Sequence, residues 1–166
     1  MLSLSCWEDK MEYVDFNKDF VERTKEIIEK TTLCEYDVTL LINCLMGLVN
    51  LPTERTKKRN TTFIKTCVNE LYRIHAVTKD SGDANKTFRA LRNATSHMRI
   101  ATTNSKNQID TVQFYDKKRE TTNSHTELTF SVEQLKEYAL FVADEYLKQF
   151  VKKTSQSKIA KQSVSK

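Results

Sequence analysis

Three side chains within six residues have the types and spacing needed to cleave a phosphodiester: Arg92, Asn93 and His97. Arginine carries a permanent positive charge on a planar fork of donors that suits phosphate oxygens. Histidine gives or takes a proton near neutral pH. A site that holds both can bind a phosphoryl group and move the proton that its cleavage requires.

The spacing limits how one helix can present these residues. Asn93 and His97 are four apart and share a helical face, so the amide can orient the imidazole. Arg92 is five residues from His97, which places it about 140° around the axis. Either the helix ends near Ser96 and His97 swings over the last turn, or two copies of the helix face each other in a dimer. Both arrangements can occur in the same protein, because a two-fold interface sets the same patch of each subunit against its mate.

The same residues also fit a role without chemistry. Arg92 is then a solvated charge on a helix, and His97 is a cation that complements the negative end of the helix dipole. Spacing alone leaves both readings open.

Two blocks of the chain resemble a known family. The string Leu91–His97, followed by Met98, Arg99 and Ile100, resembles the signature of the HEPN domain (higher eukaryotes and prokaryotes nucleotide-binding). This signature is an Arg, a polar residue, a few variable residues and a His. The block Tyr36–Pro52 resembles the second helix of small, often plasmid-borne HEPN nucleases. The resemblance covers most of residues 14–150.

The resemblance implies a helical bundle that dimerises and a metal-independent endoribonuclease whose cleft combines the motif from both subunits. The matching positions are Arg92, Asn93 and His97. His97 would be the general base or acid, Arg92 would hold the phosphoryl oxygens, and Asn93 would fix His97. No metal and no cofactor is expected, and the biological role would be that of a toxin or an anti-phage defence protein. Two alternatives remain: a non-catalytic HEPN module that binds RNA, a nucleotide or a partner protein, and a toxin held inactive by an antitoxin or other regulatory partner.

Further polar residues are candidates for RNA binding. Ser96 and Arg99 flank His97, and a basic run follows Pro52. Such a run is either a solvated loop or a contact to the RNA backbone. The RNA-binding candidates outside the motif are therefore Ser96, Arg99, Lys57, Lys58 and Arg59.

Composition predicts a single, mainly helical domain. The 166 residues include only two glycines and one proline, which favours helices with few tight turns. The formal charge of +5 comes from the end of the chain, because residues 152–166 hold five lysines and no acid. We therefore expect a domain over residues 1–151 and a basic flexible tail over 152–166. The apolar run at 38–49 is interrupted and too short to span a membrane.

Periodicity predicts an all-α fold in the main, a bundle of four to five helices with a small β-hairpin near 109–130. Apolar residues recur at helical spacing from Asp15 or Asn17 to about Lys30, and again in later segments. Pro52 is expected to end the second helix. The motif helix should dock through a stripe at 88, 91, 95 and 98, and Ser131–Gln134 forms a capping box for the last helix. The predicted helices after the first one cover residues 38–52, 63–74, 84–98 and 131–150.

The cysteines Cys6, Cys34, Cys44 and Cys67 form no CxxC pair and have no histidine at zinc spacing. They are expected to be reduced thiols in a cytoplasmic protein.

Overall fold

The computed structural model describes residues 15–32, 37–55, 61–79, 82–105, 108–116 and 126–163. The fold of these parts is mainly helical, as predicted. The helices are α1 (Phe16–Lys30), α2 (Asp37–Arg55), α3 (Thr61–Arg73), α4 (Ala84–Ser96) and α5 (Val132–Ser163). The strands are β1 (Val77–Lys79), β2 (Ile100–Ser105), β3 (Gln108–Tyr115) and β4 (Glu127–Ser131).

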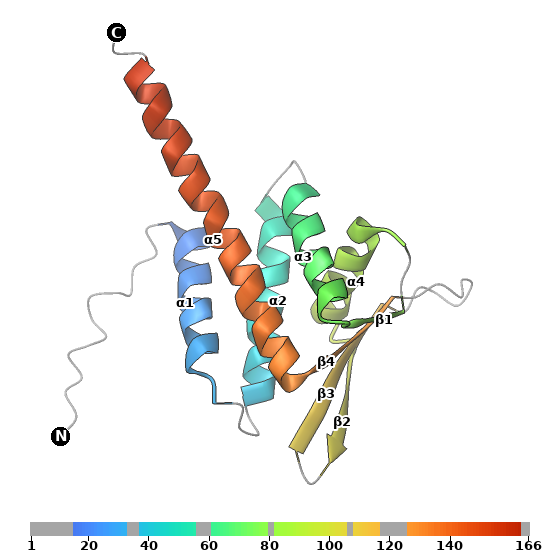
Figure 1. Cartoon of the computed structure of the whole chain (residues 1–166). Helices are drawn as coiled ribbons and strands as arrows, with labels where there is room; N and C mark the ends of the chain where they lie inside the picture. The colour runs from blue at the N-terminus through green and yellow to red at the C-terminus, as the bar shows by residue number, and fades with distance from the viewer. Residues whose placement is uncertain are drawn as a thin grey trace, which may run out of the picture.

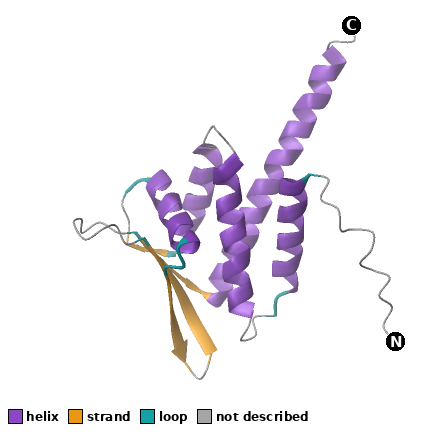
Figure 2. Ribbon diagram, turned by 180° about the vertical axis from the view of Figure 1, so that it is seen from behind, coloured by secondary structure: helices purple, strands orange, loops and turns teal. Residues whose placement is uncertain are grey.

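The last helix organises the bundle. α5 packs against α1, α2 and α3, and its first turns also contact β3 and β4. The strands form one antiparallel sheet in the order β1-β4-β3-β2. Figure 1 and the reverse view in Figure 2 place this sheet on the α4 side of the bundle, away from α1. The motif helix α4 contacts α2, α3 and β3, so it lies where the bundle meets the sheet.

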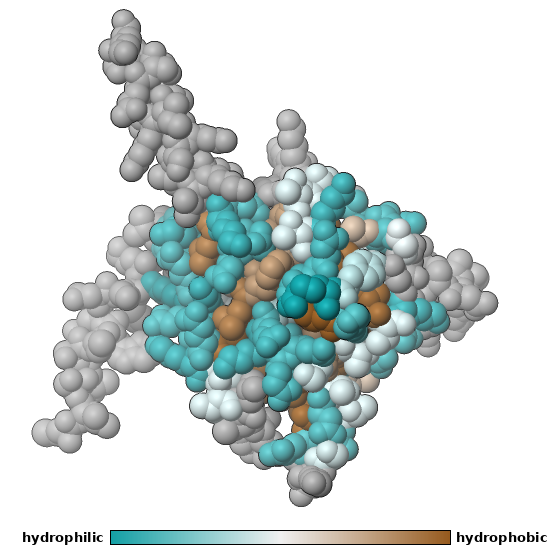
Figure 3. Space-filling model, in the orientation of Figure 1, coloured by the Kyte–Doolittle hydropathy of each residue, from teal (hydrophilic) through white to brown (hydrophobic). Residues whose placement is uncertain are grey.

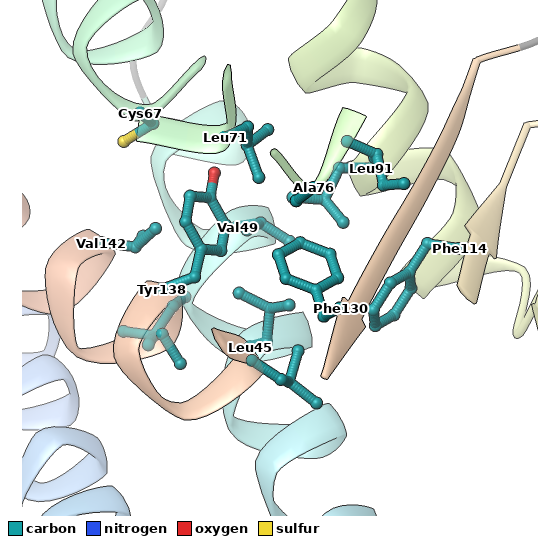
Figure 4. Close-up of a cluster of buried hydrophobic side chains, with 14 of the residues drawn as sticks. Leu45, Val49, Cys67, Leu71, Ala76, Leu91, Phe114, Phe130, Tyr138 and Val142 are labelled. Atoms are coloured by element: carbon teal, nitrogen blue, oxygen red, sulfur yellow. The ribbon is translucent and has the colours of Figure 1, made fainter. Parts of the chain in front are cut away.

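A common core joins the helices to the sheet. In Figure 4 the ring of Phe130 from β4 lies between Tyr138 of α5 and Phe114 of β3. The ring centroids are 5.6 Å apart for Phe130 and Tyr138 and 5.8 Å apart for Phe114 and Phe130. All three side chains are fully buried. The aromatic residue Tyr138 of the last helix is therefore core, as its apolar periodicity predicts.

Short polar side chains begin the helices where the sequence predicts them. The carboxylate of Asp15 accepts a hydrogen bond from the backbone N–H of Lys18 at 3.4 Å, and α1 begins at the next residue after Asp15. The predicted capping box at α5 is present. The backbone N–H of Ser131 donates to Gln134 Oε1 at 2.8 Å, and the backbone N–H of Gln134 donates to Ser131 Oγ at 3.2 Å.

The sheet is larger than the predicted hairpin: the two predicted strands are present as β3 and β4, which pair antiparallel, but the tight hairpin lies earlier in the chain. β2 and β3 form the tight hairpin, over residues 100–115, and β3 pairs in turn with β4 in the register Val112↔Phe130. β2 escapes prediction because every residue after Ile100 is exposed, so the strand has no alternation of apolar and polar positions. β1 has three residues, too few to show a period.

Two helices extend beyond their predicted ends. α2 continues past Pro52 to Arg55. Because proline has no backbone N–H, the helix lacks one hydrogen bond there, the one to the carbonyl of Leu48. α5 continues to Ser163, so most of the segment 152–166, expected to be a flexible tail, is helical. Propagating an existing helix is far easier than nucleating one, and Lys, Gln and Ala are good helix formers. In Figure 1 this end of α5 projects beyond the other helices.

The face of the protein in Figure 3 is mainly hydrophilic, with smaller apolar areas between polar side chains. Of the helices described, none combines the length and apolar character that a membrane span requires. Among the described residues, the exposed large hydrophobic side chains are Phe16 and Ile27 of α1, Leu40 of α2, Tyr72 of α3 and Met98, which follows α4.

Candidate active site at the end of α4

The motif helix α4 docks through one face and presents the other to solvent. Asp83 caps its start and accepts a hydrogen bond from the backbone N–H of Asn85 at 2.9 Å. Its buried residues are Thr87, Phe88, Ala90, Leu91, Ala94 and Thr95. This confirms three positions of the predicted stripe. The fourth was wrong, because Met98 lies beyond the helix end with 63% of its surface exposed.

A Schellman motif ends α4 and places His97 at the exposed end of the helix. The backbone N–H of Arg99 donates to the carbonyl of Ala94 at 2.8 Å, and that of Met98 donates to the carbonyl of Thr95 at 3.3 Å. Met98 has a φ of 52°, the left-handed conformation that this motif requires at its corner. The helix therefore ends at Ser96, one of the two arrangements that the spacing allowed, and the chain enters β2 within a few residues.

A chain of polar contacts links Arg92 to the sheet. Arg92 Nη2 donates to Asn93 Oδ1 at 3.3 Å, and Asn93 Nδ2 donates to Asp116 Oδ2 at 3.3 Å. Arg99 Nη1 donates to the other oxygen, Asp116 Oδ1, at 2.8 Å. The network holds two guanidinium groups against one carboxylate, so it retains a net positive charge suited to a phosphate.

The imidazole of His97 stands apart from this network. His97 is exposed, and its backbone N–H donates to the carbonyl of Asn93 at 3.0 Å. Within the described ranges no hydrogen bond or ion pair reaches its side chain. In a single chain Asn93 therefore holds Arg92 and not His97, which differs from the role expected for it. The imidazole is left accessible to a substrate or to a second chain.

The other side of the α4 end is tied to α2. Ser96 Oγ donates to Asn50 Oδ1 at 2.9 Å. Asn50 belongs to the segment Tyr36–Pro52, so the two blocks that carry the family resemblance meet at this contact. The Ser96 hydroxyl remains exposed at the rim of the site.

Sequence reasoning missed two residues of this site, Asp116 and Asn50. Asp116 follows the apolar alternation of β3, and Asn50 interrupts an apolar helix, so each is a polar residue at the edge of an apolar pattern. That signal is weak because it occurs at many positions. The predicted RNA-binding residues Lys57, Lys58 and Arg59 lie outside the described residues.

No group of three or more His, Cys, Asp or Glu side chains that could hold a metal ion occurs in the part of the chain that the structure describes. Cys44 and Cys67 are buried free thiols in α2 and α3. Burial raises the pKa of both thiols, which keeps them protonated and unreactive near neutral pH.

A mainly helical bundle with Arg92, Asn93 and His97 near the end of a docked helix is the arrangement expected of a HEPN-type domain. Comparison with protein families agrees, because the family model described as HEPN pEK499 p136 matches residues 7–153. The chain belongs to this HEPN family. Neither the curated proteins nor the solved structures contain a match to the chain.

Proposed function

We propose that this protein is a metal-independent endoribonuclease whose active site is built from Arg92, Asn93 and His97. The observation that carries the proposal is the exposed, uncommitted imidazole of His97 at the end of the helix that also holds Arg92. Membership of a HEPN family supports it, since HEPN domains are commonly ribonucleases.

The proposed reaction is attack of the RNA 2′-hydroxyl on the adjacent phosphorus. One histidine takes the proton of the 2′-hydroxyl as general base, and the departing 5′ oxygen receives a proton from a general acid. The P–O5′ bond breaks as the new bond forms, which leaves a 2′,3′-cyclic phosphate and a 5′-hydroxyl. Arg92 stabilises the charge on the phosphoryl oxygens in the transition state.

This chemistry favours a site shared by two chains. The reaction needs both a base and an acid, whereas the motif supplies one histidine in each chain. Two copies of His97 facing each other provide both roles. In such a dimer Arg92 of one chain can also lie near His97 of the other, although the two residues are about 140° apart around one straight helix. Met98, exposed beside His97, offers an apolar contact for such a dimer.

Association is tested with Met98→Glu, and Leu40→Glu serves as its control, because Leu40 is also a large exposed hydrophobic residue but lies on α2. We expect Met98→Glu to weaken dimerisation in sedimentation and to reduce RNA cleavage at low protein concentration. Leu40→Glu should change neither. A monomer that cleaves RNA at a rate independent of dilution contradicts the shared site.

The function itself is tested by incubating purified protein with labelled tRNA and mRNA in EDTA. Removing the Arg92 side chain should reduce cleavage by about 10²–10³-fold, the usual loss for a group that stabilises transition-state charge. Arg89→Ala is the matched control, since Arg89 is an exposed arginine on the same helix. Wild-type cleavage by a folded Arg92→Ala variant contradicts the assignment.

Product ends distinguish the mechanism from hydrolysis by an activated water. We expect a 2′,3′-cyclic phosphate, or its opened form, and a 5′-hydroxyl, detected by mass spectrometry. A 2′-deoxy substitution at the cut site should block cleavage. Efficient cleavage of DNA, or a strict need for Mg²⁺, contradicts 2′-hydroxyl attack.

Further RNA contacts are assigned to Ser96 and Arg99 at the rim and to the basic run Lys57, Lys58 and Arg59. Removing a lysine or arginine that contacts a phosphate should reduce the slope of log K for RNA binding against log salt concentration by about one unit. A slope unchanged by combined substitution of the basic run removes that run from the interface.

A non-catalytic RNA-binding module is the second candidate, favoured by one observation: Asn93 is hydrogen-bonded to Asp116 and does not support His97 within one chain. RNA binding without cleavage under all tested conditions supports it. For the enzyme, a toxin or defence role predicts that expression of the wild type arrests growth while His97→Ala does not. Co-purification of a protein that restores growth would identify an antitoxin.

A further inference from the structure

Asp116 is held at the junction of three structural elements. It directly follows β3, and its backbone N–H donates to the carbonyl of Thr126 at 3.2 Å, just before β4. The preceding residue, Tyr115, donates its backbone N–H to the carbonyl of Arg99 at 3.2 Å, just before β2. These two bonds tie the main chain at Asp116 to the segments that lead into β4 and β2. Its side chain, 20% exposed, reaches α4 from the sheet.

The chemistry of the carboxylate decides how Asn93 is oriented. An ionised carboxylate only accepts hydrogen bonds, whereas an amide has one accepting and one donating end. Because Asp116 Oδ2 faces Asn93 at 3.3 Å, the amide must present its nitrogen to Asp116. The amide oxygen then faces the opposite way, where it accepts from Arg92 Nη2 at 3.3 Å. Asp116 thereby makes Asn93 an acceptor for Arg92.

Arg99 binds the second oxygen of the Asp116 carboxylate. Its Nη1 donates to Asp116 Oδ1 at 2.8 Å, so each oxygen of Asp116 serves a different donor. The charge of the carboxylate is balanced by Arg99. Arg92 contacts the network through the neutral amide of Asn93, and its own charge is left for an anionic substrate.

We propose that Asp116 is a positioning residue that orients Arg92 through Asn93. Its catalytic consequence rests on the proposed ribonuclease function, but the orientation itself does not. The sheet thereby sets the direction of the guanidinium on α4.

The informative substitution is Asp116→Asn, which keeps the size of the side chain. Asparagine has an NH₂ group in place of one carboxylate oxygen, so one of the two donors, Arg99 or Asn93, would face another donor where Asp116 offers an acceptor. The matched control is Asp110→Asn, on the same strand β3, where the carboxylate accepts from Ser105 Oγ at 2.9 Å. Both variants remove one negative charge from β3 or its end.

The first readout is the ¹H–¹⁵N spectrum of the side-chain amides and arginine Nε groups in the full chain. The Asn93 amide signals are assigned by their loss in Asn93→Ala, and the Arg92 Nε signal by its loss in Arg92→Ala. We expect Asp116→Asn to shift both sets of signals and Asp110→Asn to leave them in place. Unchanged signals in Asp116→Asn overturn the proposal.

The second readout is the rate of RNA cleavage. We expect Asp116→Asn to lower kcat by up to about 10²-fold, the loss typical of a small misplacement of a catalytic group, with KM little changed. In an Asn93→Ala background the same substitution should have no further effect, because the link to Arg92 is already broken. Additive losses in this double-mutant cycle indicate a merely structural role and overturn the proposal.

Failure of the positioning role and failure of the ribonuclease function are distinguishable. If Arg92→Ala is inactive while Asp116→Asn cleaves RNA at the wild-type rate, the positioning role is wrong and the ribonuclease stands. If Arg92→Ala cleaves RNA at the wild-type rate, the ribonuclease site is wrong, and the spectra alone decide whether Asp116 orients Arg92.

Discussion

The left-handed corner at Met98 should be relieved by glycine. Met98 has a φ of 52° and its side chain is 63% exposed, so its removal loses little packing within one chain. A residue with a Cβ pays about 1–2 kcal/mol in this conformation. Glycine avoids that strain but loses about 0.5–1 kcal/mol through its greater freedom in the unfolded chain. We expect Met98→Gly to raise the free energy of unfolding by about 0.5–1 kcal/mol, from the difference between these terms.

Two other positions test the same reasoning away from the site. His75 occupies the equivalent corner at the end of α3 with a φ of 54°, so His75→Gly should also stabilise. Gly82 has a φ of 74° and open space around its Cβ position, so Gly82→Ala should destabilise by strain alone. Urea unfolding of all three variants is measured at a protein concentration low enough for the monomer to predominate, so that the dimer contact proposed for Met98 does not contribute. The reasoning is refuted if Met98→Gly destabilises the fold as Ser96→Gly, inside the helix, is expected to do.

Three further changes test the core. Tyr138→Phe should leave stability unchanged or raise it by about 1–2 kcal/mol in urea unfolding, because the buried hydroxyl has no partner among the described residues; a clear loss contradicts this. Burial raises the pKa of Cys67 above its ordinary 9.0, so the contribution of this thiol to the free energy of unfolding is intact below pH 9 and falls at higher pH by about 1.4 kcal/mol per pH unit. Cys67→Ala should flatten this fall of the free energy of unfolding with pH, and an unchanged pH dependence contradicts the reasoning. Gly47→Ala should lower the thermal midpoint, because its Cβ would lie 2.8 Å from Phe20 Cζ; an unchanged midpoint contradicts that contact.

The helices were predictable because their signals are local. The N-cap at Asp15 and the capping box at Ser131 and Gln134 depend on residues within one turn, and each forms the predicted hydrogen bonds. β2 was not predictable, because its exposed polar residues gain order only by pairing with β3. Its position depends on tertiary contacts that a local pattern does not contain.

The site shows the same division. The Arg92, Asn93 and His97 pattern could be recognised from the resemblance, whereas the helix end near Ser96 was one of two arrangements that the spacing left open. The contact of Asn93 with Asp116 spans 23 residues and depends on where β3 ends against α4. The left-handed turn at Met98 was also hidden, because methionine has no preference for that conformation. Sequence alone therefore named the motif but not what orients it.

The central claim is that His97 cleaves RNA, and one rate comparison tests it most directly. His97→Ala is measured against wild type on RNA in EDTA, with His75→Ala as the control, since both histidines are exposed residues at helix ends. Loss of a general acid or base predicts a fall of about 10²–10⁴-fold for His97→Ala. His75→Ala should cleave at the wild-type rate. A folded His97→Ala variant that cleaves RNA as fast as the wild type contradicts the account.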